Sequence, residues 1–289
     1  MTAATDEPVG VDTERLSRWL RSTIEPELTS VAAERIGGGN SSGAWRLDVT
    51  TTAGTRALVL KAPNDGGLVH ACDAAREGRI LAAARQAGAP VPKVVAIEES
   101  GDVLGVPCFV MELVDGRGVP EDTPASFHGD GWFRDADTAT QRSTWFSFLD
   151  ALGELHAVDA HAVPASYGTD GPSDFLAYWR RSLLDAAPAH LVPRQLAVID
   201  WLTDHIPAGA GDGSALCMGD ARLGNALLNG NDVHTLVDFE VASSETPPLT
   251  SATASCKKPS SAPSLTGRPP AYRRPTKRGN TGRPKPVAQ

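Results

Sequence analysis

Residues 218–225 read Met-Gly-Asp-Ala-Arg-Leu-Gly-Asn, and residues 236–240 read Leu-Val-Asp-Phe-Glu. Asp220 and Asn225 lie five residues apart in a predicted loop, and Asp238 ends an apolar strand. Phosphoryl transfer requires a carboxylate beside the attacking hydroxyl and oxygen ligands for Mg²⁺ at the nucleotide phosphates. We therefore expect Asp220 to orient or deprotonate a hydroxyl, and Asn225 and Asp238 to hold Mg²⁺. Taken alone, these residues also fit ordinary turn and strand-end positions.

A lysine and a glutamate upstream fit the same chemistry. Lys61 ends a strand predicted over residues 55–61, and Glu77 follows sixteen residues later in a helix predicted over residues 73–87. A strand lysine held by a helix glutamate presents a cation to the α- and β-phosphates of ATP. Each residue alone also fits a solvated surface charge. Their order, spacing and predicted elements together favour a kinase-like arrangement.

A glycine-rich turn precedes this lysine. Backbone N–H groups in such a turn could cover the phosphates of a nucleotide, although most glycine turns are only turns. The residues that we expect to contact the nucleotide here are Gly38, Gly39, Asn40 and Ser41.

The hydrophobic patterns divide the chain into three parts. Residues 1–114 are rich in predicted strands, with helices predicted over residues 16–24 and 73–87. Residues 115–244 are mostly helical, with helices predicted over residues 138–158, 173–187 and 193–206 and two short strands predicted over residues 226–228 and 233–238. The expected fold is therefore α+β and bilobal, with a β-rich N-lobe and a helical C-lobe. Residues 245–289 are rich in Pro, Ser and Thr without apolar periodicity, and this composition is typical of disorder.

The composition excludes several classes of protein. The net charge of −8 combines +8 in residues 245–289 with −16 in the rest, and an acidic body disfavours broad nucleic-acid binding. No apolar run is long enough to span a membrane, and the first residues lack a secretory-signal pattern, so we expect a cytoplasmic protein. The four cysteines form no Cys-x-x-Cys pair, which disfavours zinc ribbons and disulfide frameworks.

The chain resembles the aminoglycoside phosphotransferase/choline kinase-like family, whose members are related to protein kinases. The resemblance runs from about residue 36 to residue 243. It is carried by residues 76–81 (Arg-Glu-Gly-Arg-Ile-Leu), 110–116 (Val-Met-Glu-Leu-Val-Asp-Gly), 152–159 (Leu-Gly-Glu-Leu-His-Ala-Val-Asp) and 219–225. The loop over residues 220–225 looks closest to the subgroup associated with acyl-CoA dehydrogenases.

The resemblance implies a phosphotransferase that moves the γ-phosphoryl of ATP, with Mg²⁺, to a hydroxyl of a small molecule. ATP would lie between the lobes, against a hinge strand that includes Met111 and Leu113. Lys61 would contact phosphate, Asp220 would be the catalytic base, and the subgroup points to a hydroxylated metabolite or acyl-CoA as acceptor. His156 resembles a structural helix histidine of the family. Arg222 faces either substrate or phosphate in this comparison, or lies on the surface.

The chain departs from the family pattern at two places. Met218 stands where the family usually has a histidine, and a thioether hydrogen-bonds poorly, so we expect an impaired catalytic loop. After Ser243 the family continues into helices that complete the C-lobe, whereas this chain continues into the basic segment. Suitable codons for residues 244–253, read one base displaced, encode Gly-Asn-Pro-Ala-Ala-Asp-Ile-Gly-Tyr, which is the expected continuation. We therefore hypothesise a frameshift near Ser243.

Two alternatives to an active phosphotransferase follow from the second departure. A truncated C-lobe would give a catalytically impaired pseudokinase that at most binds nucleotide, with apolar helix faces left uncovered. Alternatively, the basic segment is a genuine extension that binds nucleic acid or an acidic protein. Salt-sensitive binding that is lost when residues 245–289 are deleted would support this second alternative.

Overall fold

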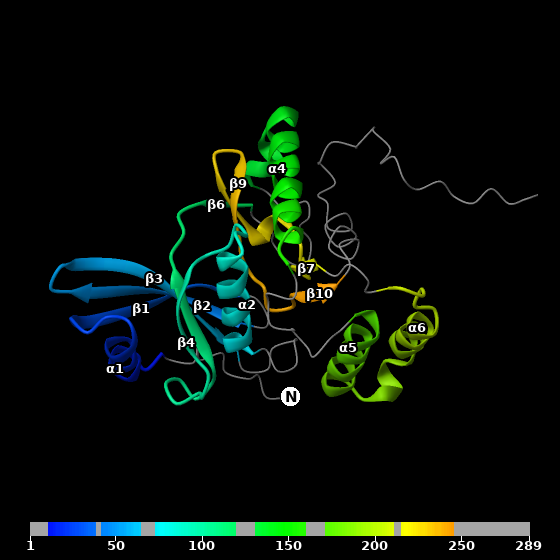
Figure 1. The fold of residues 1–289 in the computed structure, drawn as a ribbon, viewed down its shortest axis with the longest axis horizontal. Helices are drawn as coiled ribbons and strands as arrows, with labels where there is room; N and C mark the ends of the chain where they lie inside the picture. Colours follow the sequence, from blue (N-terminus) through cyan, green and yellow to red (C-terminus); the bar gives the residue numbers. More distant parts are fainter. Residues whose placement is uncertain are drawn as a thin grey trace, which may run out of the picture.

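The structure is a computed structural model, and it describes residues 11–38, 42–64, 73–119, 131–159, 171–210 and 215–245. A sheet-rich N-lobe lies at one end, and a mostly helical C-lobe lies at the other (Figure 1). This arrangement confirms the predicted α+β, kinase-like bilobal fold.

The N-lobe is built on a five-stranded antiparallel sheet in the order β1-β2-β3-β5-β4. Its strands are β1 (Leu28–Gly38), β2 (Ser42–Thr51), β3 (Gly54–Pro63), β4 (Val94–Glu98) and β5 (Cys108–Glu112). Its helices are α1 (Thr13–Thr23) and α2 (Ala74–Gln86). Each helix begins after an aspartate, Asp12 or Asp73, whose carboxylate accepts hydrogen bonds from backbone N–H groups of the first turn.

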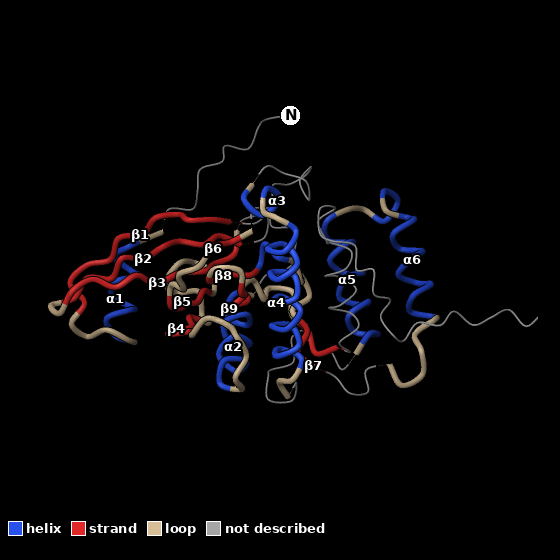
Figure 2. Tube along the Cα trace, turned by 90° about the horizontal axis from the view of Figure 1, so that it is seen from above, coloured by secondary structure: helices blue, strands red, loops and turns tan. Residues whose placement is uncertain are grey.

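The C-lobe contains α3 (Trp132–Asp135), α4 (Thr138–His156), α5 (Pro172–Ala186) and α6 (Pro193–Asp204). It also contains two small sheets, seen from above in Figure 2. One has the order β6-β8-β9, formed by Arg117–Gly118, Ala226–Asn229 and Asp232–Leu236. The other pairs β7 (Ala215–Cys217) with β10 (Ser243–Glu245). The three longer helices confirm those predicted from the apolar periodicity.

A single hydrophobic core joins the two lobes. It connects Leu81 of α2 and Phe109 of β5 with Phe148 of α4, and it continues through Met218 and Phe239. The segments that bear Asp220 and Asp238 are therefore anchored by fully buried neighbours on the same core. A second core packs α1 against the other side of the five-stranded sheet.

Helices α5 and α6 pack against each other, as both views show (Figures 1 and 2). None of the residues of α6 is buried among the described parts of the chain. Several large apolar side chains on α6 and just before it are exposed instead, namely Leu191, Val198, Trp201 and Leu202. In the described ranges, none of the helices is long and apolar enough to cross a membrane.

Candidate active site

Lys61 joins a helix of the N-lobe to the Asp238 loop. It lies on β3, opposite Phe109 of β5, and only 8% of its surface is exposed. Its Nζ donates to Glu77 Oε1 at 2.9 Å and to Asp238 Oδ1 at 2.5 Å. The structure therefore brings together three residues that are separated by up to 177 positions in the sequence.

Electrostatics in this triad are governed by burial and by the two carboxylates. Burial acts to lower the pKa of Lys61, but the charges of Glu77 and Asp238 outweigh it and raise that pKa above its usual value. Burial raises the pKa of the Glu77 carboxyl, and the charge of Lys61 opposes this rise. Among the described residues, Glu77 Oε2 has no hydrogen-bond partner, whereas Oε1 also accepts from the backbone N–H of Phe239. Lys61 consequently remains a cation at neutral pH.

Asp238 is held in an uncommon backbone conformation. Its φ of 69° lies in the left-handed region, where it is the only non-glycine residue of the described chain. Phe239 anchors the next position in the core, and Arg76 of α2 donates to the carbonyl oxygens of Glu240 (3.4 Å) and Ala242 (2.8 Å). These contacts fix the loop so that the Asp238 carboxylate points to Lys61.

The Asp220 loop forms a second cluster. Arg222 Nε donates to Asp220 Oδ2 at 2.9 Å. Asn225 Nδ2 donates to the same oxygen at 3.2 Å and to the Asp220 carbonyl at 3.0 Å. The carboxylate is thus oriented from two sides by residues of its own loop. Gly219 has a φ of +80°, and a Cβ there would lie 2.2 Å from the carbonyl oxygen of Val241, so only glycine allows the two loops this approach.

Met218 does not face this cluster. Its side chain is fully buried in the core that joins the lobes. Hydrogen bonds within the loop come instead from Arg222, Asn225 and the backbone N–H of Asp220, which donates to the Met218 carbonyl at 3.1 Å. The methionine therefore acts as a core residue, and the loop keeps an ordered set of hydrogen bonds without the histidine.

Both clusters border one cavity of about 470 Å³. Six of the predicted site residues line it, namely Lys61, Glu77, Met111, Leu113, Asn225 and Asp238. Arg222 lines it too, whereas Asp220 is not a lining residue and accepts hydrogen bonds from Arg222 and Asn225. Val59, Leu81 and Leu227 make part of its wall apolar, which suits a planar base at the Met111 end.

The predicted nucleotide turn is described only in part. Gly38 ends β1, whereas Gly39, Asn40 and Ser41 lie outside the described residues. Ser42, at the start of β2, donates from Oγ to Glu240 Oε2 at 3.1 Å. The hairpin is thereby tied to the loop that carries Asp238.

The donor set at the cavity fits Mg²⁺. Mg²⁺ prefers oxygen ligands and is commonly bound by one or two protein groups together with substrate phosphates. Asp238 offers a carboxylate, and the amide nitrogen of Asn225 is engaged by Asp220, so the amide oxygen is the atom that Asn225 can offer to a metal. Among the described residues, no group of three or more His, Cys, Asp or Glu side chains is arranged as a metal site. A metal at this place would therefore be held by protein groups together with phosphate oxygens.

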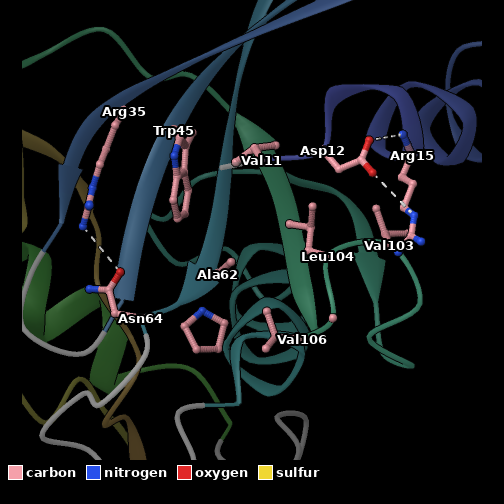
Figure 3. A pocket seen from close by; sticks show the side chains of 12 residues that line it. Val11, Asp12, Arg15, Arg35, Trp45, Ala62, Asn64, Val103, Leu104 and Val106 are labelled. Carbon is pink, nitrogen blue, oxygen red and sulfur yellow. Dashed lines mark hydrogen bonds and ion pairs between the residues drawn. The ribbon is translucent and has the colours of Figure 1, made fainter. Parts of the chain in front are cut away.

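A smaller cavity of about 180 Å³ lies elsewhere in the N-lobe, between α1 and the sheet (Figure 3). Arg35 lies over the ring of Trp45 and donates to Asn64 Oδ1 at 3.4 Å. The Asp12–Arg15 ion pair lies at the other end of this cavity. None of the predicted site residues lines it.

Sequence reasoning missed three contributors to the site: Arg76, Ser42 and Glu240. Each acts through a contact between segments more than 160 residues apart, so local periodicity carries no signal for it. Glu240 was visible only as part of the Asp-Phe-Glu sequence. His156 ends α4, and burial lowers its pKa.

Comparisons with known proteins identify the family of the chain. The sequence pattern of the phosphotransferase enzyme family matches residues 32–247. The chain is 28% identical over 195 residues to acyl-CoA dehydrogenase family member 10 of Mus musculus, covering 65% of this chain and 17% of that protein. It is 27% identical over 243 residues to acyl-CoA dehydrogenase family member 11 of Gallus gallus, covering 80% of this chain and 29% of that protein. The matched region is thus less than a third of these curated relatives.

Solved structures share the fold. An aminoglycoside phosphotransferase-like protein of Ralstonia eutropha superposes with a TM-score of 0.57 at 23% identity, covering 80% of this chain and 65% of that chain. A ternary complex of APH(2")-IIa with streptomycin and ATP gives a TM-score of 0.53 at 14% identity, covering 84% of this chain and 75% of that chain. Since the family pattern covers most of the chain, the protein belongs to the phosphotransferase enzyme family.

Proposed function

We propose that this protein is an ATP- and Mg²⁺-dependent phosphotransferase that moves the γ-phosphoryl group to a hydroxyl of a small molecule. One observation carries the proposal. The Lys61–Glu77–Asp238 triad and Asn225 line the same cavity, and Asp220 accepts a hydrogen bond from Asn225. A phosphate-binding cation, a metal ligand set and a base are the parts that phosphoryl transfer requires.

Each residue then has a defined task. Lys61, held by Glu77, binds the α- and β-phosphates, and the adenine ring of ATP lies toward Met111 and Leu113. Asp220 accepts the proton of the acceptor hydroxyl while the acceptor oxygen bonds to the γ-phosphorus. The bond from that phosphorus to the bridging oxygen breaks, and ADP leaves. Catalysis of this kind depends on positioning and charge neutralisation, without a covalent enzyme intermediate.

Asn225 and Asp238 would hold Mg²⁺ at the phosphates. The metal supplies neutralisation of the charge on the β- and γ-phosphate oxygens. Asp238 also accepts a hydrogen bond from Lys61, so the same carboxylate would orient the phosphate-binding lysine and bind the metal.

The acceptor is a small hydroxyl-bearing molecule. Structural neighbours include complexes with hygromycin B and with streptomycin, and the curated relatives are acyl-CoA dehydrogenase family members. The similarity to the acyl-CoA dehydrogenase family members supports a hydroxylated metabolite or a hydroxylated acyl-CoA rather than an antibiotic as the acceptor.

A screen for ADP release tests the proposal. The full chain is incubated with ATP, Mg²⁺ and a panel of hydroxylated acids, acyl-CoA derivatives and aminoglycosides. We expect release above the acceptor-free rate with one class. Asp220→Asn should reduce it about 10²–10⁴-fold, the usual size of a general-base contribution. Asp232→Asn, at an exposed position of β9, is the matched control and should leave the rate unchanged. Equal turnover in the Asp220 variant would show that the base is misassigned.

A second candidate is a nucleotide-binding pseudokinase without transfer. The exposed apolar side chains of α6 favour it, because they indicate a helical region without its full packing partners. ATP-dependent thermal stabilisation with no ADP release from any acceptor class would support this candidate over the first.

A further inference from the structure

We infer that the cavity of about 180 Å³ between α1 and the five-stranded sheet is a second binding site, and that its ligand is a small monocarboxylate built on a single aromatic ring. This site is separate from the proposed nucleotide site. Its chemistry follows from its apolar walls, from one arginine that has no acidic partner among the described residues, and from its size.

The strands β2 and β3 contribute side chains to both cavities. Ala44 and Lys61 line the larger cavity, whereas the next residue on each strand, Trp45 or Ala62, lines the smaller one. Successive side chains of a strand point to opposite faces of its sheet. The two cavities therefore lie on opposite faces of the same strands, and a ligand in the smaller one leaves the nucleotide cavity open.

The walls of the smaller cavity are mostly apolar. The ring of Trp45 forms one wall, and this residue is only 7% exposed (Figure 3). Gly43 makes room for that ring, because a Cβ there would lie 2.4 Å from Cη2 of Trp45. The other apolar lining residues are Val11, Ala62, Pro63, Val103, Leu104 and Val106. A flat apolar group can therefore be buried between the indole ring and the loop that joins β4 to β5.

Arg35 supplies a positive charge at one end of the cavity. Its guanidinium lies 5.7 Å from the centre of the Trp45 ring and donates to Asn64 Oδ1 at 3.4 Å, and both partners are neutral. Arg46 and Arg56 of the same sheet instead pair with carboxylates at 2.9 and 3.0 Å. Within the described ranges Arg35 has no such carboxylate, so its charge and its remaining N–H donors are available to an anion.

The opposite end of the cavity adds little net charge. Asp12 pairs with Arg15 at 3.5 Å and also accepts from the backbone N–H groups of Glu14 and Arg15. Figure 3 shows this pair across the cavity from Arg35. One uncompensated positive charge favours a monoanion over a doubly charged phosphate ester, and the planar guanidinium fork matches the geometry of a carboxylate.

The volume limits the rest of the ligand. A space of 180 Å³ corresponds to about six water molecules, at about 30 Å³ for each in the liquid. Drug-sized ligands occupy pockets of about 300 Å³ or more, so a nucleotide is too large. A single ring fits, and its edge or face can pack on Trp45 as aromatic pairs do, while its carboxylate reaches Arg35. Benzoate is the simplest molecule with this chemistry.

Ligand-observed NMR of the full chain, without nucleotide, measures the binding of benzoate, benzamide and acetate. Benzoate should bind saturably. Benzamide keeps the ring but lacks the charge, so it should bind about ten-fold or more weakly. Acetate keeps the charge but lacks the ring, and it should also bind about ten-fold or more weakly, because it buries little apolar surface. Equal binding of benzoate and benzamide would show that no anion is recognised and would overturn the inference.

Variants of the lining residues locate the binding. Arg35→Gln should weaken benzoate binding about ten-fold or more and leave benzamide binding within about two-fold. Val106→Phe, at a half-buried lining position, should abolish binding of both by filling the space. Arg46→Gln is the matched control, because Arg46 follows Trp45 on β2 and lines neither cavity. It should bind benzoate as the unsubstituted protein does.

Folding is checked by thermal unfolding of each variant. Arg35 is exposed, so Arg35→Gln should unfold at nearly the same temperature as the unsubstituted protein. If Val106→Phe does not fold, the contrast between Arg35→Gln and Arg46→Gln still decides. Equal benzoate affinity in these two variants would overturn the inference.

Competition with AMP-PNP separates this site from the nucleotide cavity. Saturating AMP-PNP should leave benzoate bound, whereas competitive displacement would place benzoate in the larger cavity and overturn the inference. Benzoate binding by a protein that fails to bind AMP-PNP would overturn the proposed function and leave the second site in place. Absence of benzoate binding would do the reverse.

Discussion

The charged network at the cavity and the helix pair α5–α6 show opposite ways of placing charged and apolar groups. In the first, Lys61 and Glu77 are buried and their partners come from distant segments. In the second, the Arg180–Asp200 ion pair is exposed, and apolar Trp201 is 58% exposed. The first arrangement is costly to assemble because the buried charges lose their water, whereas the second leaves apolar surface that packing would normally cover.

The two regions differ in how completely their side chains are packed. The cavity is lined by the Lys61–Glu77–Asp238 triad and Asn225, and an anchoring core lies beside them within the described residues. Helix α6 uses one face to pack on α5 and presents Val198, Trp201 and Leu202 on another. We therefore expect substitutions at the two places to differ sharply in size and in kind.

The largest difference should come from removing one cation in each region. Lys61→Met leaves Glu77 buried without its cation and should cost about 3–5 kcal/mol of unfolding free energy. Arg180→Met breaks an exposed pair and should cost less than about 1 kcal/mol. Urea denaturation of both variants measures this contrast, and equal costs would contradict it.

The cost of Lys61→Met should also depend on pH. Burial raises the pKa of Glu77, and a group whose folded pKa is raised stabilises the fold when protonated and loses that contribution as pH rises. Without the lysine, the variant should therefore be less destabilised at pH 5 than at pH 8. A cost that stays constant across this range would show that Glu77 is not the group left without a partner.

A smaller effect should follow from polar substitutions on α6. Val198→Lys combined with Leu202→Lys should reduce the binding of a hydrophobic dye and increase solubility, with a change in unfolding free energy within about 0.5 kcal/mol. Leu152→Ala in α4, which is 3% exposed, is the contrasting variant and should cost about 2–5 kcal/mol. Strong destabilisation by the lysine pair would mean that this face is covered in the folded protein.

Replacement of the basic segment offers a sharper version of this test. If translation of residues after Ser243 in the displaced frame supplies packing partners for α6, the resulting protein should bind less dye than the present chain. Comparison of ADP release by the two proteins would then show whether the same change restores transfer. Equal dye binding would argue against the frameshift hypothesis.

The smallest effect concerns a thiol of the sheet. Burial raises the pKa of Cys108 to about 12, so at pH 8 it should hold about 10³-fold less thiolate than an ordinary cysteine. Alkylation followed by mass spectrometry should leave Cys108 unlabelled in the folded protein and label it in denaturant. Rapid labelling under native conditions would show that β5 opens readily.

Local patterns predicted much of the fold. The helix expected over residues 73–87 is α2 (Ala74–Gln86), and that expected over residues 138–158 is α4 (Thr138–His156). Strand β1 (Leu28–Gly38) was not predicted, because the sequence indicated only the glycine-rich turn at its end. It is an edge strand in which Leu28 alone is buried among the described side chains, so its apolar signal in the sequence is weak.

The parts of the fold that were not predicted depend on pairing between distant segments of the chain. Strands β7 and β10 are three residues each and pair across 28 positions, so neither has a detectable period. For the site, the sequence predicted the contact of Lys61 with Glu77 because a specific chemistry requires it. The contact of Arg222 with Asp220 depends on a loop conformation that no local pattern encodes, and so does the hydrogen bond from Arg76 to the carbonyl oxygen of Ala242.

The central claim is that Lys61, Glu77, Asp220, Asn225 and Asp238 surround a metal-bound triphosphate. Calorimetric titration of AMP-PNP into the full chain, with Mg²⁺ and then with EDTA, tests it most directly. We predict that removing Mg²⁺ weakens binding about ten-fold or more, and that Asp238→Asn abolishes this dependence on the metal. Absence of binding, or the same Mg²⁺ dependence in the Asp238 variant, would contradict the account.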